Sequence, residues 1–203
     1  MPATDWDARY QSGDTPWEKG APHPALVDFL REENNAPLIA AARILVPGCG
    51  CGHDVRALAD ADAEPLGIDI APGAIIRAEA FEKAARERFE LADLFALPER
   101  FHGAFDAVWE HTCFCAIDLA MRPHYVTAIA NALKSHGHLL AVFYLDPGHA
   151  NESEGPPFGV TREELDGLFG THFQLVREWV PARTYEGREG RELMRILQKR
   201  PLS

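Results

Sequence analysis

The sequence lacks both the long apolar run of a membrane span and the basic-then-apolar leader of a secreted protein. No stretch approaches the about 20 apolar residues of a transmembrane helix, and the chain begins MPATDWDARY. We therefore expect a cytoplasmic protein without a membrane partner. Basic side chains are also few, because Lys and Arg total 20 against 31 Asp and Glu. This acidic excess repels a phosphate backbone and argues against nucleic acid as a partner.

Cysteine is scarce as well, with two Cys-x-Cys pairs at Cys49/Cys51 and Cys113/Cys115. Without a secretion signal we expect no disulfides. Structural zinc sites usually separate paired cysteines by two to four residues, and the first pair here lies inside a glycine-rich segment. The four sulfurs could converge on a metal if the two segments were neighbours, but we predict no metal.

What the chain does contain is a regular alternation of apolar strand-like and helix-like segments. Its 203 residues, 46% of them apolar, suffice for one domain with its own core. Strand–helix alternation predicts a parallel sheet covered on both faces. We expect a single-domain, Rossmann-like α/β fold over 1–203, with a lid segment at 1–23 and the core at 24–203. The seven expected strands, the last two forming an antiparallel hairpin, are 42–47, 64–70, 88–93, 103–110, 138–146, 172–183 and 191–199.

The expected helices lie between these strands. One begins at Pro24, after an irregular N-terminal stretch, and the others are predicted at 53–61, 72–87, 121–137 and 161–170. Thr161 and Glu164 have the spacing of a helix capping box.

The segment ILVPGCGCGHD (44–54) joins the first strand to a helix through Gly48, Gly50 and Gly52. Glycine permits positive φ and lets a ligand approach the backbone, while the helix N-terminus offers free N–H groups. Asp69 ends the second strand, 21 residues after Gly48, where an acid binds ribose hydroxyls in nucleotide-binding folds. The alternative is a tight turn without a ligand. The agreement of strand, helix and acid favours a nucleoside site.

The kind of nucleoside is indicated by two further positions. A dinucleotide-binding loop has the pattern G-x-G-x-x-G, but its last glycine position is held here by His53. Asp93 closes the third strand, where a carboxylate or a backbone group can reach an adenine amino group. An NAD-dependent oxidoreductase is therefore the less favoured reading.

These features together resemble the class I S-adenosylmethionine-dependent methyltransferases. The VPGCG…GHD segment is similar to the thiopurine methyltransferase family, and most similar to its thiol and halide methyltransferase branch. Three more segments resemble that family in the same order along the chain, namely TPWEKGAPHPAL (15–26), FCAIDLAMRPHY (114–125) and GPPFGVTREELDGLFG (155–170). Val46 stands where the superfamily loop usually carries an acid, which we interpret as a departure typical of this family.

The resemblance implies S-adenosylmethionine as cofactor, with its methionine portion against the glycine loop. A tryptophan face can attract the sulfonium through a cation–π interaction. The expected cofactor contacts are Trp6, Trp17, Val46, Gly48, Gly50, Gly52, Asp54, Asp69, Ile70, Asp93, Leu94 and Glu110.

The implied reaction is direct in-line methyl transfer to a small soft nucleophile, a thiol or possibly a halide. An anionic nucleophile needs alignment and a water-poor site rather than a strong general base. We expect Tyr144 to orient the acceptor, Cys115 to form a polarizable wall and Phe158 to cover the pocket. His111 is a candidate proton acceptor, or otherwise a pocket wall. Arg122 matches an arginine of the family and is a candidate for holding an anionic acceptor, or otherwise a surface residue at a helix start.

Several alternatives stay open at this point. The same cofactor could serve an oxygen, nitrogen, selenium or tellurium acceptor, or the protein could bind S-adenosylmethionine without turnover. The identity of the acceptor and the oligomeric state do not follow from the sequence.

Overall fold

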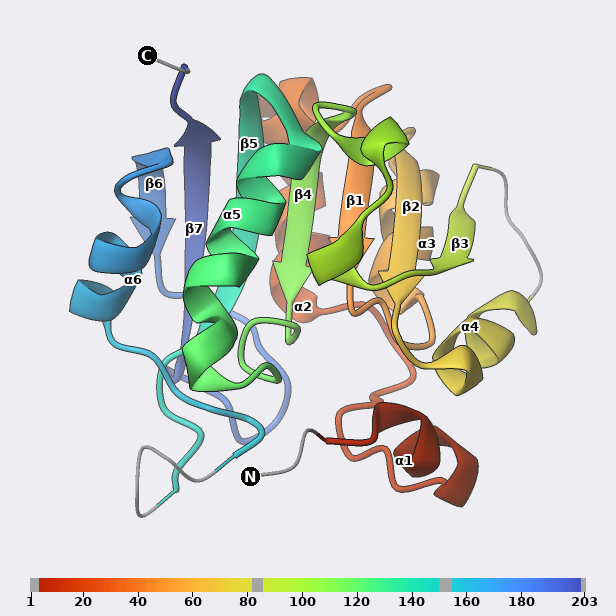
Figure 1. Ribbon diagram of the computed structural model, residues 1–203. Helices are drawn as coiled ribbons and strands as arrows, with labels where there is room; N and C mark the ends of the chain where they lie inside the picture. The colour runs from red at the N-terminus through yellow and green to blue at the C-terminus, as the bar shows by residue number, and fades with distance from the viewer. Residues whose placement is uncertain (1–3, 82–85, 150–154, 202–203) are drawn as a thin grey trace.

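A seven-stranded sheet in the order β3-β2-β1-β4-β5-β7-β6 forms the centre of the protein (Figure 1). The computed structural model describes residues 4–81, 86–149 and 155–201. The strands are β1 Arg43–Pro47, β2 Glu64–Asp69, β3 Arg88–Leu91, β4 Phe105–His111, β5 Leu133–Tyr144, β6 Phe173–Trp179 and β7 Glu192–Lys199.

The first five strands pair in parallel, and β7 pairs antiparallel with both β5 and β6. This arrangement confirms the predicted α/β fold with its antiparallel C-terminal hairpin. The chain runs outward from β1 through β2 to β3 and then returns to place β4 on the other side of β1. Open sheets bind ligands at such a reversal, beyond the carboxyl ends of the strands.

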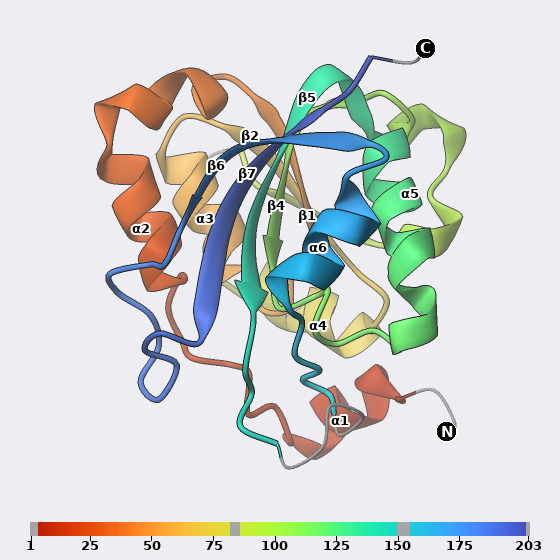
Figure 2. The ribbon, with the colours of Figure 1, turned by 90° about the vertical axis from the view of Figure 1, so that its left-hand side faces the viewer.

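Helices cover both faces of the sheet (Figure 2). On one face, α2 (Pro24–Arg31) and α3 (His53–Asp60) bury apolar side chains such as Leu26, Phe29 and Leu58 in one core cluster. On the other face, α5 (Arg122–Ala132) and α6 (Arg162–Phe169) contribute to a second cluster. Within the described ranges, no helix has both the length and the apolar character of a membrane span.

The helix expected over 121–137 is the clearest error in the sequence-based prediction. Helix α5 ends at Ala132, and Leu133 already begins β5 opposite Phe105. The register between β4 and β5 shifts before His138, and His136 has a positive φ of 62°. This irregularity interrupts the strand pattern of alternating burial, so the segment 133–137 looks like a helix end in the sequence.

The N-terminal stretch is also more regular than predicted. Helix α1 (Trp6–Ser12) begins at Asp5, whose side chain accepts a hydrogen bond from the Ala8 N–H, and ends at Gly13 with a φ of 77°. Tyr10 is its single buried side chain, so it has little of the apolar periodicity by which a helix is recognised. Figure 1 places α1 beyond the carboxyl ends of β1 and β2.

Of the remaining helices, α2, α3 and α6 agree closely with expectation, whereas α4 ends earlier than predicted, at Glu79. Helix α2 begins at Pro24 as predicted, and α4 spans Pro72–Glu79 within the range expected as 72–87. Residues 82–85, in the rest of that range, and 150–154, in the polar loop before α6, lie outside the described residues. Short 3₁₀ turns occur at Glu33–Leu38, Leu94–Ala96, Glu99–Phe101 and Leu119–Met121.

Candidate active site

A cleft of about 700 Å³ opens where the parallel strands end. Its wall combines the α1 region, the loops that follow β1 to β4, the end of β5, the 155–158 loop and the β6–β7 connection. Predicted site residues that line it are Trp6, Trp17, Gly48, Asp69, Ile70, Asp93, Leu94, Cys115, Tyr144 and Phe158. Segments far apart in the sequence therefore meet around one space, large enough for two small ligands side by side.

The glycine loop after β1 has the left-handed backbone that its sequence predicts. The φ angles of Gly48, Gly50 and Gly52 are 59°, 53° and 76°. An L side chain is strained in this region of φ. The alternating glycines thus serve the turn itself, and Gly48 is the one that lines the cleft.

Side chains of the protein also press on this loop. A Cβ atom on Gly50 would lie 3.1 Å from the Tyr10 hydroxyl, and one on Gly52 would lie 2.4 Å from the Phe89 ring. Close packing within the protein is therefore a further reason for these glycines, beyond the positive φ and the ligand approach expected from the sequence.

Asp69 connects the glycine loop to the end of β2. Its Oδ2 accepts a 3.0 Å hydrogen bond from the Gly50 N–H, and its Oδ1 accepts one of 2.9 Å from the Ala71 N–H. Burial raises the pKa of this carboxyl, and the backbone N–H groups act in the opposite direction. A carboxylate has about four lone-pair positions, so two bonds leave Asp69 able to accept hydroxyl groups from the cleft.

The next part of the wall offers an apolar surface beside a carboxylate. Ile70 is 57% exposed although it is aliphatic, and Leu94 also lines the cleft, with 8% of its surface exposed. The Asp93 side chain accepts a 2.8 Å hydrogen bond from the Phe95 N–H, which begins a 3₁₀ turn. Apolar side chains around a few polar groups suit a flat aromatic base.

Two tryptophans from the N-terminal segment line the cleft opposite these loops. The rings of Trp6 and Trp17 pack edge to face at 5.4 Å, and Trp17 Nε1 donates a 3.1 Å hydrogen bond to the Tyr10 hydroxyl. The guanidinium of Arg9 lies 4.4 Å from the Trp17 ring centroid. The Trp17 ring therefore already holds a cation of the protein itself.

Polar contacts dock this N-terminal segment on the core. The Gly73 N–H donates a 2.7 Å hydrogen bond to Asp7, and Arg77 donates one of 2.5 Å to the Tyr10 carbonyl. Glu18 lies 2.8 Å from Nε2 of His53, at the start of α3. The segment is thus fixed to α3 and α4, the two helices nearest the glycine loop and Asp69.

Cys115, Tyr144 and Phe158 form another part of the cleft wall, together with Arg188. The Phe158 N–H donates a 2.7 Å hydrogen bond to the Cys115 carbonyl, which holds the 155–158 loop against the segment after β4. Burial raises the pKa of the Cys115 thiol to about 12. This cysteine is a neutral thiol at physiological pH, consistent with a wall residue and not with a nucleophile.

Other predicted residues lie behind the cleft wall and are not among the described residues that line it, namely Val46, Gly50, Gly52, Asp54, Glu110, His111 and Arg122. Val46 is a buried residue of β1, and Glu110 is 1% exposed. Glu110 accepts a 2.8 Å hydrogen bond from the Phe114 N–H and is also hydrogen-bonded to the Tyr125 hydroxyl. Burial raises the pKa of Glu110 to about 7.

Arg122 does not reach the cleft in this structure. Its side chain is 2% exposed and forms a 2.6 Å ion pair with Glu164 of α6. It also donates a 2.9 Å hydrogen bond to the Gly159 carbonyl. These contacts join α5, α6 and the 155–160 segment, which corrects the expectation that Arg122 holds the acceptor and also the alternative that it is a surface residue.

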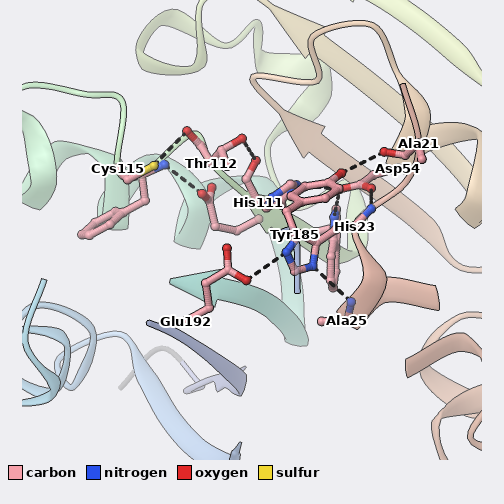
Figure 3. Close-up of polar contacts among 12 residues, drawn as sticks. Ala21, His23, Ala25, Asp54, His111, Thr112, Cys115, Tyr185 and Glu192 are labelled. Carbon is pink, nitrogen blue, oxygen red and sulfur yellow. Dashed lines mark hydrogen bonds and ion pairs between the residues drawn. The ribbon is translucent and has the colours of Figure 1, made fainter. Parts of the chain in front are cut away.

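His111 and Asp54 belong to a largely buried polar cluster beside the cleft (Figure 3). Asp54 Oδ2 lies 3.0 Å from His111 Nδ1 and accepts a 2.8 Å hydrogen bond from Trp109 Nε1, while Oδ1 accepts one of 2.7 Å from the His23 N–H. Burial opposes ionisation of Asp54, but His111 and these donors lower its pKa to about 2. Since an ionised carboxylate only accepts, Nδ1 of His111 is the donor in this contact. Its buried Nε2 has no partner in the part of the chain that the structure describes.

His23, His111 and Glu192 place three potential metal ligands within 4.8 Å of one another. The hydrogen bonds favour a different reading. His23 Nδ1 accepts a 3.2 Å hydrogen bond from the Ala25 N–H, so the ring proton is on Nε2, which lies 3.0 Å from Glu192. A metal would need the lone pair of that same nitrogen, so this cluster is a hydrogen-bonded network. The cysteine pairs do not form such a group among the described residues.

The sequence-based analysis missed Arg188, Glu192 and His23. Arg188 and Glu192 lie around the polar TYEGREG segment, which carries no recognisable motif, and His23 precedes the proline of α2. Only the antiparallel pairing of β7 with β5 brings Glu192 opposite Tyr144 at the cleft.

The fold and the glycine loop with its β2 acid define a class I S-adenosylmethionine-dependent methyltransferase. A solved Burkholderia thailandensis 1,6-didemethyltoxoflavin-N1-methyltransferase with bound S-adenosylhomocysteine superimposes with a TM-score of 0.73 at 20% identity, covering 97% of this chain and 86% of that one. The family model for thiopurine S-methyltransferase matches residues 1–188. The chain belongs to this family, which confirms the predicted fold, family and cofactor.

Two curated plant proteins are similar in sequence. Thiocyanate methyltransferase 1 of Brassica oleracea is 35% identical over 159 residues, which cover 76% of this chain and 66% of that protein. Probable thiol methyltransferase 2 of Arabidopsis thaliana is 31% identical over 166 residues, which cover 79% of this chain and 69% of that protein. These relatives lie in the thiol and halide branch that the sequence motifs indicate.

Proposed function

We propose that this protein transfers the methyl group of S-adenosylmethionine to a small soft nucleophile, a thiol or a thiocyanate-like anion, by direct in-line displacement. The observation that carries this proposal is the single continuous cleft, because Asp69 and Tyr144 both line it. Donor and acceptor bound in one space can meet without a covalent enzyme intermediate.

The cofactor is proposed to lie along Gly48, Asp69, Ile70 and Asp93. Asp69 would accept the ribose hydroxyls, and the Asp93 region would contact the adenine. Residues 1–23 act in this proposal as a lid over the 24–203 core, with Trp6 and Trp17 beside the sulfonium. The lid excludes water, which strengthens the reactivity of an anionic nucleophile.

The proposal of a soft acceptor is supported by the side chains of the cleft wall. No histidine is among the described residues that line it, and Cys115 is a neutral thiol. A nucleophile that arrives as an anion needs no base, whereas an alcohol or amine acceptor usually does. The names of the two plant relatives point to the same kind of acceptor. The acidic composition supports the further expectation that nucleic acid is not a partner.

The test is turnover of S-adenosylmethionine with a panel of acceptors. The purified protein would be incubated with thiols, thiocyanate, halides, selenite, tellurite, a phenol and an amine, and methylated products would be identified by mass spectrometry. We expect S-adenosylhomocysteine to accumulate with thiols or thiocyanate. Methylation of the phenol or amine alone would contradict the soft-acceptor assignment. Cofactor binding without turnover on any acceptor would indicate a binding protein.

A further inference from the structure

Arg188 is a basic residue of the cleft wall that no sequence motif singles out. It lies in the connection between β6 and β7 and lines the cleft together with Cys115 and Tyr144. The same three residues border a small hollow behind the wall. The Arg188 side chain is 14% exposed, so its charge lies at the acceptor part of the cleft and not in bulk solvent.

Contacts on several sides hold the Arg188 guanidinium in place. Its Nη1 lies 3.0 Å from Oε1 of Glu192, a buried carboxylate whose Oε2 is paired with His23. The guanidinium carbon lies 4.7 Å from the Tyr144 ring centroid and 5.6 Å from that of Tyr185. Stacking and ion pairing fix the orientation of the group before any ligand arrives, which lowers the entropy lost on binding.

Most of the hydrogen-bonding capacity of Arg188 is unused. A guanidinium carries five N–H donors, and the bond to Glu192 is its one side-chain hydrogen bond within the described residues. We propose that Arg188 forms an anion-binding subsite that holds the negative charge of the methyl acceptor. This inference rests on the proposed function, since it assumes that the acceptor occupies this part of the cleft.

The surroundings select the type of anion. Glu192 compensates part of the Arg188 charge, and Asp118 and Glu186 also line the cleft. This negative potential repels a dianion such as sulfate about twice as strongly as it repels a monoanion, because the repulsion is proportional to the charge of the anion. The guanidinium is itself weakly hydrated, so it suits a weakly hydrated monoanion such as a thiolate or thiocyanate.

Two other basic side chains line the cleft, both from the N-terminal segment. Arg9 is paired with Asp14 at 3.0 Å and lies over the Trp17 ring. Lys19 is exposed to solvent. A solvated ammonium binds a weakly hydrated anion less well than a fixed guanidinium does, so Lys19 is the competing candidate that the experiment must separate from Arg188.

The kinetic test compares Arg188→Met with Arg191→Met and Lys19→Met, using thiocyanate as the acceptor. Arg191 is in the same connection but is not among the described residues that line the cleft, so it controls for the loss of one charge. We expect Arg188→Met to raise the KM for thiocyanate at least about tenfold, the loss of a charge-assisted hydrogen bond. The KM of Arg191→Met for thiocyanate should stay close to that of the unsubstituted protein. The inference would be overturned if Lys19→Met alone raised the KM for thiocyanate, or if Arg188→Met left this KM unchanged.

A second measurement needs neither a variant nor turnover. Crystals of the unsubstituted protein with S-adenosylhomocysteine and iodide would be examined for an anomalous peak, because iodide is a weakly hydrated monoanion. We expect the peak within contact of the Arg188 guanidinium. A peak only at Lys19, or none in the cleft, would refute the subsite. Failure of the methyltransferase assay with every acceptor would instead refute the proposed function, so the two failures are distinguishable.

Discussion

The Gly50 N–H donates a 3.0 Å hydrogen bond to Oδ2 of Asp69, which links the glycine loop after β1 to the carboxyl end of β2. The same carboxylate lines the cleft. Asp69 therefore shapes the glycine loop and at the same time lies in the cleft wall.

Substitution of Asp69 by Ala should weaken S-adenosylhomocysteine binding by at least about tenfold, because charge-assisted hydrogen bonds are worth about 1.5–3 kcal/mol each. Isothermal titration calorimetry measures this directly. Asp69→Asn keeps the shape of the side chain and one acceptor oxygen, so its affinity for S-adenosylhomocysteine should lie between that of the unsubstituted protein and that of Asp69→Ala. Unchanged affinity in a folded Asp69→Ala protein would show that this carboxylate is not the ribose ligand.

Substitution of Gly52 by Ala should reduce stability more than the same change at Gly103. Both glycines have positive φ, 76° and 60°, which costs an L residue about 1–2 kcal/mol. A Cβ atom on Gly103 meets nothing within 4 Å, whereas one on Gly52 would lie 2.4 Å from the Phe89 ring. Urea unfolding of both variants separates the clash from the backbone strain. An equal loss of unfolding free energy in the two variants would mean that the Phe89 ring moves aside without cost. If the ring does not move, the additional substitution Phe89→Leu should restore part of the stability of Gly52→Ala.

Glu110 should make the protein less stable as the pH rises from about 4.5 to about 7. Its pKa is raised to about 7 in the folded state, mainly by burial. Between these values the unfolded chain releases the proton and the folded chain retains it, so unfolding becomes more favourable with increasing pH. The free energy of unfolding should fall by about 3 kcal/mol over this pH range, since one pKa unit corresponds to about 1.4 kcal/mol.

Glu110→Gln should remove most of this pH dependence when urea unfolding is measured between pH 4.5 and pH 8. Gln keeps the acceptor for the Phe114 N–H and cannot ionise. Glu99→Gln at an exposed site is the control, and its profile should follow that of the unsubstituted protein. An identical slope in Glu110→Gln would assign the pH dependence to other groups.

Removal of residues 1–19 should reduce methyl transfer far more than His111→Asn does. The truncation removes Trp6 and Trp17 from the cleft and opens it to water. Asn at position 111 can still donate to Asp54 but lacks the unpartnered Nε2. We expect His111→Asn to cost less than the about 100-fold that marks the loss of a general base. Single-turnover rates with the best acceptor provide the comparison, with circular dichroism to verify folding. The opposite ranking would assign a base function to His111 and point to an oxygen or nitrogen acceptor.

Local patterns were enough to predict most of the fold and several of the residues that line the cleft, such as Asp69. The buried run of β1, the alternating glycines and Asp69 are close in sequence, and each has a direct physical reason for its position. Arg188, by contrast, could not be predicted in this way. Arg122 and Arg188 are both arginines near loops, but Arg122 pairs with Glu164, 42 positions away, and is removed from the cleft. Arg188 is placed in it by the pairing of the last strand, which no local pattern encodes.

The position of β7 also affects how the chain can fold during its synthesis. This strand is the last in sequence but lies between β5 and β6, so β6 has no neighbour in the sheet until β7 is inserted. Protein domains tend to fold as units while N-terminal segments emerge first. Here the sheet is completed only after residues 192–199 have left the ribosome, and a nascent chain exposes the β5 edge until then. Glu192, which pairs with Arg188, is the first residue of that strand. A chain that stops short of Glu192 therefore lacks both the strand that joins β5 to β6 and the partner of Arg188.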